Sequence, residues 1–508
     1  MRGTPKNALR FLGTPTHPYE GTGDAVTNGR ETAVADLVIR GGTVVSPDAQ
    51  FAASVAIKDG KVLAVGAQEA MPSARETLDA SGLHVLPGAI DVHVHFRDPG
   101  YAHKEDFESG TAAAAFGGVT TVFDMPNTIP PTGTADALAA KHALAAEKAH
   151  VDFGLYGLLG EDTIAHVPEL VAGGVIGFKL YMGNTFGKIP SPSTGAMLEA
   201  FETVAPTGKR ISLHAETNSI MELRETRLRE AGRTDPLAHL ASRPAVVAVE
   251  AVSRAAILSE WTGARIHILH ISSADELAPL REAKARGVEI TGETGPHYLM
   301  LSADDYARLG GVIRVNPPVR EARNQEPLWA ALADGTIDLI ATDHAPHARE
   351  EKTKNDIWSV DCGFPGVETQ MPLMLTAVQA GRMTLCDYVR LSAANPARIW
   401  GLYPRKGAIQ PGADADIAVV DLAREWTIAD AALQSRSKIT PWNGRRVKGL
   451  PVHTLVRGRF VMRARQLVAD TRGWGRSVHA IQAMPPPRPA NTAQTMQAIL
   501  APATKTLP

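Results

Sequence analysis

Two kinds of apolar pattern divide this chain of 508 residues. Toward both ends, short runs of β-branched residues meet at glycine-rich turns, which is typical of paired antiparallel strands. These runs cover residues 36–45, 55–65, 412–422 and 452–462. Because the two ends share this pattern, we expect their strands to meet in one small β-sandwich domain.

The middle of the chain, from about residue 88 to 402, has a different pattern. Apolar strand-like runs alternate with alanine- and leucine-rich stretches of helical length, which indicates βα units and a parallel sheet. Helices are expected at 136–149, 243–261 and 274–286. The eight strand-like runs end near His95, Asp124, Tyr156, Lys179, His214, His270, Glu293 and Asp343. Eight strands with crossovers predict an α/β fold, a closed (β/α)8 barrel of the TIM type.

The predicted organisation inserts the barrel into the β domain. The β-sandwich takes residues 36–87 and 408–470, and the barrel takes residues 88–407. Residues 1–35 are rich in glycine, proline and threonine, lack the apolar core of a secretory signal, and are expected to be a flexible extension. Residues 471–508 include a proline cluster and are expected to be a C-terminal tail.

Composition narrows the class of protein. Apolar residues make up 44% and charged residues 21% of the chain, as in an average globular enzyme. The net charge of -2 and the absence of a basic run argue against a nucleic-acid or membrane partner, so we expect a small-molecule substrate. No segment is apolar for long enough to span a bilayer. Cys362 and Cys386 are the only cysteines, which favours a reducing, cytoplasmic setting.

His93 and His95 are the first candidate metal ligands. They are two residues apart, so on a strand both side chains project from the same face and can bind one cation. A hydrogen-bonded structural pair is the alternative. Metal-binding residue types also end four other predicted strands: Lys179, His214, His270 and Asp343. Because the C-terminal ends of barrel strands converge on one mouth, the set as a whole indicates a metal-dependent catalytic site.

Lys179 is the unusual member of this set, since a charged ammonium repels cations and its ordinary pKa is about 10.4. Burial and adjacent metals would favour the neutral amine. A neutral amine can take up carbon dioxide and become a carbamate, which is an anionic ligand able to bridge two metals. A lysine paired with a carboxylate is the alternative that the sequence leaves open.

Asp343 opens the run DHAPH directly after an apolar strand. A carboxylate in that position can bind one metal and accept the proton of an attacking water, which is the work of a general base. Asp343 could equally cap a helix. His347, at the end of the same run, either reaches the barrel mouth or lies in solvent.

Several longer motifs carry a family resemblance over about residues 36 to 465: LPGAIDVHVHFRDPG, GGVTTVFDMPNT, GFKLYMG, SLHAE, HILHISS, GETGPHYL, VNPPVR and ATDHAPHA. The chain resembles the amidohydrolase superfamily, in its cyclic-amide branch of dihydroorotases, allantoinases and hydantoinases. The resemblance implies two Zn2+ ions per chain, bridged by a hydroxide and by carboxylated Lys179 (N6-carboxylysine), and a homo-oligomer, either a dimer or a tetramer. It assigns the ligands to His93, His95, Lys179, His214, His270 and Asp343.

Four residues in these motifs resemble the dihydroorotase pocket: Arg97, Asn127, Asn316 and His347. An arginine in this position can hold a substrate carboxylate by a bidentate contact. The alternative is a structural arginine bonded to Asp98 or Glu105.

Other stretches, including VDFGLYG, SRPAVVAVEA and ETGPHYL, are more similar to hydantoinases and allantoinases. Substrate choice is made in the pocket rather than in the scaffold. The predicted function is therefore dihydroorotase, the reversible hydrolysis of dihydroorotate to N-carbamoyl-L-aspartate in pyrimidine biosynthesis. A ring-opening allantoinase, hydantoinase or dihydropyrimidinase is the first alternative, and a non-catalytic barrel scaffold is the second.

Overall fold

A computed structural model of the protein describes residues 34–187 and 189–479, with eight parallel strands in their middle. These strands are β6 (Ala89–Val94), β7 (Val119–Asp124), β8 (Asp152–Leu159), β9 (Gly177–Tyr181), β10 (Arg210–His214), β11 (Arg265–Ile268), β12 (Ile290–Thr294) and β13 (Leu339–Ile340). Each pairs with the next along the chain. The first strand is joined to the segment that follows the last one by a parallel bridge from Val94 to His344, where the His95 N–H donates to the His344 carbonyl at 2.7 Å. The predicted barrel is confirmed.

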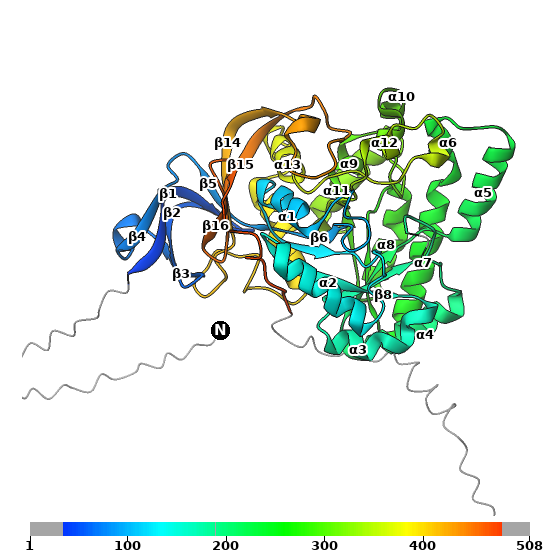
Figure 1. The fold of residues 1–508 in the computed structure, drawn as a ribbon, viewed down its shortest axis with the longest axis horizontal. Coiled ribbons are helices and arrows are strands. Elements are labelled where there is room, and N and C mark those ends of the chain that lie inside the picture. The colour runs from blue at the N-terminus through cyan, green and yellow to red at the C-terminus, as the bar shows by residue number, and fades with distance from the viewer. Residues whose placement is uncertain (1–33, 188, 480–508) are drawn as a thin grey trace, which may run out of the picture. The chain divides into compact units, whose positions relative to one another are not determined.

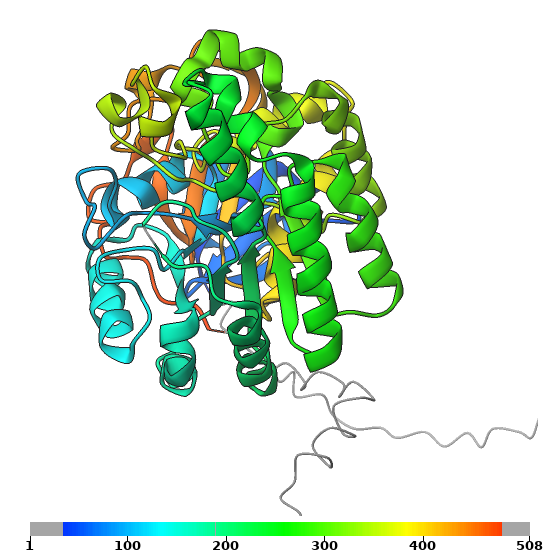
Figure 2. The same ribbon diagram turned by 90° about the vertical axis from the view of Figure 1, so that its right-hand side faces the viewer.

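Helices surround these strands (Figure 2). The long ones are α1 (Phe107–Phe116), α2 (Ala135–Lys148), α4 (Thr194–Val204), α5 (Asn218–Glu230), α7 (Ala245–Thr262), α8 (Leu277–Ala285), α11 (Gln325–Asp334) and α13 (Gln370–Gln379). The short ones are α3 (Val167–Ala172), α6 (Pro236–Ser242), α9 (Pro296–Met300), α10 (Tyr306–Leu309), α12 (Arg349–Lys352), α14 (Leu385–Val389) and α15 (Asn395–Ile399). The helices predicted from the sequence correspond to α2, α7 and α8.

Helix α7 illustrates why these segments become helices. Its buried residues Val247, Ala251 and Ala255 recur at helical spacing and form one apolar face. The helix ends at Gly263, whose φ of 72° is the left-handed conformation that favours glycine at a C-terminus. The apolar pattern therefore determines which face of α7 is buried, and Gly263 determines where the helix ends.

Strands from both ends of the chain share one nine-stranded sheet beside the barrel (Figure 1). The N-terminal strands are β1 (Ala35–Val45), β2 (Gln50–Lys58), β3 (Lys61–Gly66), β4 (Ala74–Asp79) and β5 (His84–Pro87); the C-terminal ones are β14 (Ile417–Thr427), β15 (Arg446–Val456), β16 (Arg459–Arg463) and β17 (Gln466–Leu467). The halves join where β5 pairs with β14, with Val85 opposite Val419. The two ends meet as expected, while the exact domain limits 36–87, 88–407 and 408–470 stay predictions.

The chain that follows the sheet returns to the barrel. The Val478 N–H donates to the Phe153 carbonyl at 2.8 Å, and the Trp474 indole donates to the Val456 carbonyl at 2.9 Å. Residues 471–479, which the sequence assigned to the tail, are thus held against both the barrel and the nine-stranded sheet. The predicted extension lies outside the described residues up to position 33, as does the tail from position 480. Within the described ranges, no helix is both long and apolar enough to cross a membrane.

Candidate active site

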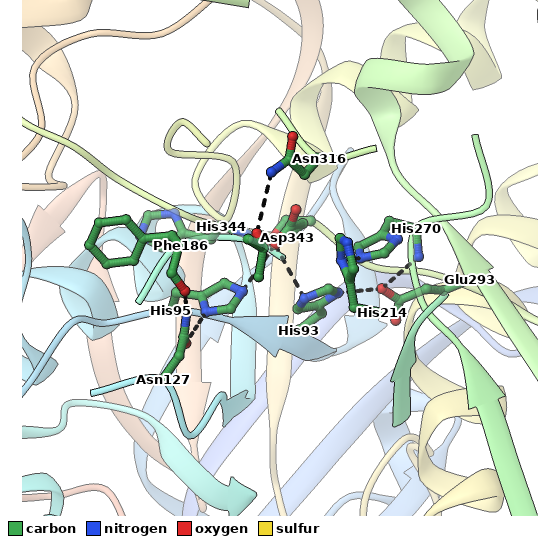
Figure 3. A network of polar contacts seen from close by, with 12 residues as sticks. His93, His95, Asn127, Phe186, His214, His270, Glu293, Asn316, Asp343 and His344 are labelled. Carbon is green, nitrogen blue, oxygen red and sulfur yellow. Dashed lines mark hydrogen bonds and ion pairs between the residues drawn. The ribbon is translucent and has the colours of Figure 1, made fainter. Parts of the chain in front are cut away.

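The six side chains predicted as metal ligands line one cavity at the C-terminal ends of the barrel strands. The Nε2 atoms of His93 and His95 lie 3.2 and 3.1 Å from Oδ1 of Asp343. Across the cavity, His214 Nδ1 lies 2.9 Å from His270 Nε2 (Figure 3). The barrel therefore brings together residues that are up to 250 positions apart, from 93 to 343, as the strand-end pattern predicted.

Two of these histidines are oriented by carboxylates on the side away from the cavity. His93 Nδ1 lies 2.6 Å from Oε1 of Glu293, and His214 Nε2 lies 3.0 Å from Oε2 of Glu216. Such outer partners hold the ring and its tautomer for metal binding. The sequence interpretation gave neither glutamate a role. The available signal was position, since Glu293 ends a barrel strand and Glu216 follows one within the SLHAE motif.

Asn127 has the same orienting geometry toward His95, with its Oδ1 2.7 Å from His95 Nδ1. Its Nδ2 donates to the Phe186 carbonyl at 3.3 Å. Asn316 lies on the opposite rim, where its Oδ1 contacts His239 Nε2 at 2.9 Å. Both asparagines line the cavity, as predicted for substrate-binding residues, and Asn127 additionally links the rim to a candidate metal ligand.

Three site residues have a strained backbone. Arg97, His270 and Asp343 have φ angles of 64°, 41° and 47°. Positive φ costs free energy in any residue with a Cβ, and such strain is concentrated at functional sites. The strain lies at the strand ends where side chains turn into the cavity, which supports a functional role for these three positions.

Lys179 is buried in the cavity, with 1% of its surface exposed. Burial lowers the pKa of its ammonium to about 7, although the Asp343 and Glu293 carboxylates act to raise this pKa. Within the described residues Lys179 forms no ion pair, and its Nζ lies 4.7 Å from the centre of the Tyr181 ring. The lysine–carboxylate pair that the sequence left open is therefore absent from this part of the chain, and a substantial neutral fraction is available for carbamate formation.

Asp343 contacts histidines rather than capping a helix. Burial acts to raise its pKa, but the hydrogen bond and charge of His95, together with His297, bring that pKa below its ordinary value. The carboxylate is therefore ionised at neutral pH, as both a metal ligand and a proton acceptor must be.

Arg97 forms a buried corner beside this cavity together with Phe186 and His347, which we call the Arg97 corner. Its Nε donates to the Pro346 carbonyl at 3.2 Å, its Nη2 lies 3.1 Å from His347 Nε2, and its guanidinium carbon lies 4.5 Å from the Phe186 ring centre. Its Nη1 is buried and has no hydrogen-bond partner. His347 is fully buried, which excludes the solvent alternative, and it reaches the site through Arg97.

The two carboxylates weighed as structural partners of Arg97 are engaged elsewhere. Asp98 pairs with Lys148 at 2.7 Å, and Glu105 accepts from the Arg436 N–H at 3.1 Å and from the Ser435 hydroxyl. Among the described residues, no ion pair involves Arg97. A buried guanidinium without a carboxylate partner is a strong candidate for an anionic ligand.

The donors at the mouth fit a divalent cation. His93, His95 and Asp343 offer nitrogen and oxygen atoms within 4.8 Å of one another, and the Nδ1 of His270 is buried without a partner. Nitrogen and oxygen donors in a buried cluster are the ligands that zinc takes in hydrolases. The described residues contain two other groups of this kind, His347–Glu351–Asp361 and Asp152–Asp414–Asp416, but each surrounds a lysine ammonium.

Comparison with known proteins decides the family. The model of the amidohydrolase family matches residues 84–461. The chain belongs to the amidohydrolase family. This confirms the resemblance that the motifs indicated, and with it the prediction of a hydrolase.

Three relatives illustrate three different activities. An L-hydantoinase from Paenarthrobacter aurescens is 35% identical over 87% of this chain and 98% of that protein. An allantoinase from Deinococcus radiodurans is 36% identical over 86% of this chain and 98% of that protein. A dihydroorotase from Geobacter sp. is 38% identical over 84% of this chain and 100% of that protein. The solved L-hydantoinase from Arthrobacter aurescens superposes with a TM-score of 0.86 over 88% of this chain and all of that one, at 35% identity.

Proposed function

We propose that this cyclic amidohydrolase is a dihydroorotase, which reversibly hydrolyses dihydroorotate to N-carbamoyl-L-aspartate. The observation that carries the proposal is the Arg97 corner, where a buried guanidinium has an unpartnered Nη1. Dihydroorotate has a carboxylate on its ring, whereas allantoin and simple hydantoins do not. A buried charge is costly unless it is paired, so a substrate carboxylate supplies what this corner lacks.

The reaction assigns a task to each part of the cavity. His93, His95, His214, His270, Asp343 and Lys179 as a carbamate would hold two divalent cations, for which zinc fits the donors. When bound, these cations would polarise the amide carbonyl and make water more acidic. Asp343 takes the proton of the attacking water and passes it to the departing ring nitrogen. Arg97, with Asn127, Asn316 and His347, orients the ring so that its amide faces Asp343.

A second candidate is the opening of a hydantoin or allantoin ring. Relatives with these activities support it, as does the superposition on the L-hydantoinase. The same cavity would serve, because only the part of the substrate that faces Arg97 would change. A non-catalytic scaffold finds less support, since every predicted ligand position carries a side chain that can bind metal. The proposed dimer or tetramer stays a prediction from family resemblance.

One assay separates the candidates. Purified protein would be given dihydroorotate, allantoin and hydantoin side by side, and ring opening would be followed for each. We expect turnover with dihydroorotate to exceed the other two by far. If the protein leaves dihydroorotate intact and opens allantoin or hydantoin, the proposed substrate is wrong and only the cyclic amidohydrolase class stands.

A further inference from the structure

A buried lysine lies directly behind the Arg97 corner. Lys104 has 4% of its surface exposed, and its Nζ lies 3.0 Å from His347 Nδ1, 2.8 Å from an oxygen of Asp361 and 3.0 Å from one of Glu351. An ammonium has three protons and no lone pair, so these three contacts use all of its donors. The metal-ligand set does not involve Lys104, which approaches the pocket, among the described residues, through His347 and Phe186.

Each nitrogen of the His347 imidazole lies near one hydrogen-bond donor and one acceptor from neighbouring residues. Nδ1 faces Lys104 at 3.0 Å and Asp361 at 3.2 Å, with an oxygen of Glu351 farther away at 3.8 Å. Nε2 faces the Cys362 carbonyl at 3.0 Å and Arg97 Nη2 at 3.1 Å. Burial and the charge of Arg97 lower the pKa of His347 to about 4. The ring is therefore neutral at neutral pH and has one proton to place.

Each of the two tautomers satisfies one pair of these contacts. With the proton on Nε2, Lys104 donates to Nδ1 and Nε2 donates to the Cys362 carbonyl, which are the two shorter contacts, both 3.0 Å. With the proton on Nδ1, the ring donates to Asp361 and accepts from Arg97. The Nδ1 proton would then point at the Lys104 ammonium at 3.0 Å, a repulsive contact between two donors, whereas in the first tautomer the corresponding contact is between the Nε2 proton and Arg97 Nη2 at 3.1 Å. Without Lys104, the remaining contacts to Asp361 and Arg97 favour the Nδ1 tautomer.

We propose that Lys104 is a positioning residue that selects the Nε2-protonated tautomer of His347 and thereby keeps the Arg97 corner open to a substrate carboxylate. In this tautomer Nε2 cannot accept from Arg97, so both Nη1 and Nη2 are left for a ligand. In the other tautomer Nη2 is used within the protein. The effect on substrate rests on the proposed function, whereas the tautomer itself does not.

Phe186 makes this coupling local. The centre of the Phe186 ring lies 4.5 Å from Lys104 Nζ and 4.5 Å from the Arg97 guanidinium carbon, and the ring packs nearly perpendicular to the His347 ring at 4.9 Å between centres. These contacts shield both cations from water. A change at Lys104 is thus transmitted to Arg97 through two rings that touch both residues.

The direct test is the protonation state of the His347 ring. Metal-loaded protein with 15N-labelled histidine rings would be studied by NMR, and the His347 signals identified by their loss in His347→Gln. We expect a protonated Nε2 and an unprotonated Nδ1 in the wild type, exchanged in Lys104→Met and retained in Lys104→Gln, whose amide still donates. A wild-type ring protonated on Nδ1, or a Lys104→Met ring that keeps Nε2 protonated, overturns the proposal.

Asp361→Asn gives an independent measurement if Lys104→Met does not fold. This change weakens the acceptor that the Nδ1-protonated tautomer needs, at a side chain that is 31% exposed. The proton on Nε2 of His347 must therefore persist in this variant. A shift to Nδ1 in this variant contradicts the selection by Lys104.

Kinetics then test the consequence for substrate. In Lys104→Met, KM for dihydroorotate should rise about tenfold or more while kcat stays within about threefold, because an orienting contact is lost and the reacting groups are untouched. Lys148→Met is the matched control, since Lys148 pairs with Asp98 and contacts neither His347 nor Arg97; its KM and its His347 signals should stay unchanged. A wild type inactive on dihydroorotate contradicts the proposed function, while the NMR result still decides the role of Lys104. A KM that stays unchanged while the tautomer switches overturns the claimed link to the carboxylate.

Discussion

Two of the clusters in the described residues that contain a lysine among potential metal ligands, one around Lys406 and one at the mouth, differ in how the lysine charge is balanced. At the opposite end of β8 from the mouth, Lys406 Nζ lies 2.7, 3.2 and 2.6 Å from oxygens of Asp152, Asp414 and Asp416. At the mouth, Lys179 lies among histidines and Asp343 without an ion pair in the described chain. The first cluster already contains its cation, whereas the second leaves neutral nitrogen donors and a lysine of lowered pKa.

This difference in charge distinguishes the proposed catalytic site at the mouth from the cluster around Lys406. Buried carboxylates need a cation, and Lys406 meets that need from within the chain. Neutral imidazoles do not bind an ammonium well, but they do bind metal ions, and burial prepares Lys179 for conversion to an anion. In both clusters three donor atoms lie within 4.8 Å of one another, so this spacing without charge would not distinguish them.

The largest expected effect is at Lys179. We expect wild-type protein purified without chelator to contain up to two divalent cations per chain, and Lys179→Ala to lose metal and fall to the detection limit of activity. Short carboxylic acids should restore part of the activity by replacing the carbamate oxygens. Elemental analysis and turnover assays measure both results. An alanine variant that keeps its metals and is active would contradict the carbamate.

Asp343→Asn should be next in size. The amide keeps the shape of the side chain but cannot accept a proton, so kcat should fall by roughly 10²–10⁴-fold. KM should change far less, because the lost interaction is made in the transition state. Steady-state kinetics with metal content measured on the same sample provide the check; unchanged turnover would remove Asp343 from the role of base.

Lys406→Met should destabilise the fold without touching the chemistry. It leaves three buried carboxylates short of their shared cation, so the free energy of unfolding should drop by about 3–5 kcal/mol. Lys61→Met is the matched control, because Lys61 also pairs with Asp414 but is 46% exposed, and its loss should be about 1 kcal/mol or less. Urea unfolding gives both values. A fully stable Lys406→Met that binds a divalent cation at this cluster would erase the contrast with the mouth.

Arg97→Met tests the substrate and has the smallest expected effect of the four changes at Lys179, Asp343, Lys406 and Arg97. Loss of a water-shielded contact with the dihydroorotate carboxylate should cost about 2–5 kcal/mol, which is roughly a 30-fold or greater drop in kcat/KM. Metal content and the melting temperature should stay near those of the wild type. Equal losses on dihydroorotate and on an uncharged cyclic amide would show that Arg97 does not read the carboxylate.

Much of this architecture was predictable because it depends on local signals. The strand runs that end near His95, Lys179 and His214 lie within a residue or two of the ends of β6, β9 and β10. The alternation of strands and helices is a property of neighbouring residues, and barrel strands place their C-terminal ends together. The ligand set could therefore be proposed before any contact was known.

The sequence by itself thus determined the order of the helices and strands, the end of the barrel at which the candidate site residues lie, and the types of those residues. Tertiary structure decided every pairing between distant segments: that Glu293 orients His93 across 200 positions, that Asp98 and Glu105 are engaged away from Arg97, and that His347 is buried against Lys104. The physical reason is range. Periodicity and capping act over a few residues. A buried charge, in contrast, pairs with whichever group the closed barrel brings near it, and the sequence alone does not distinguish between the possible partners.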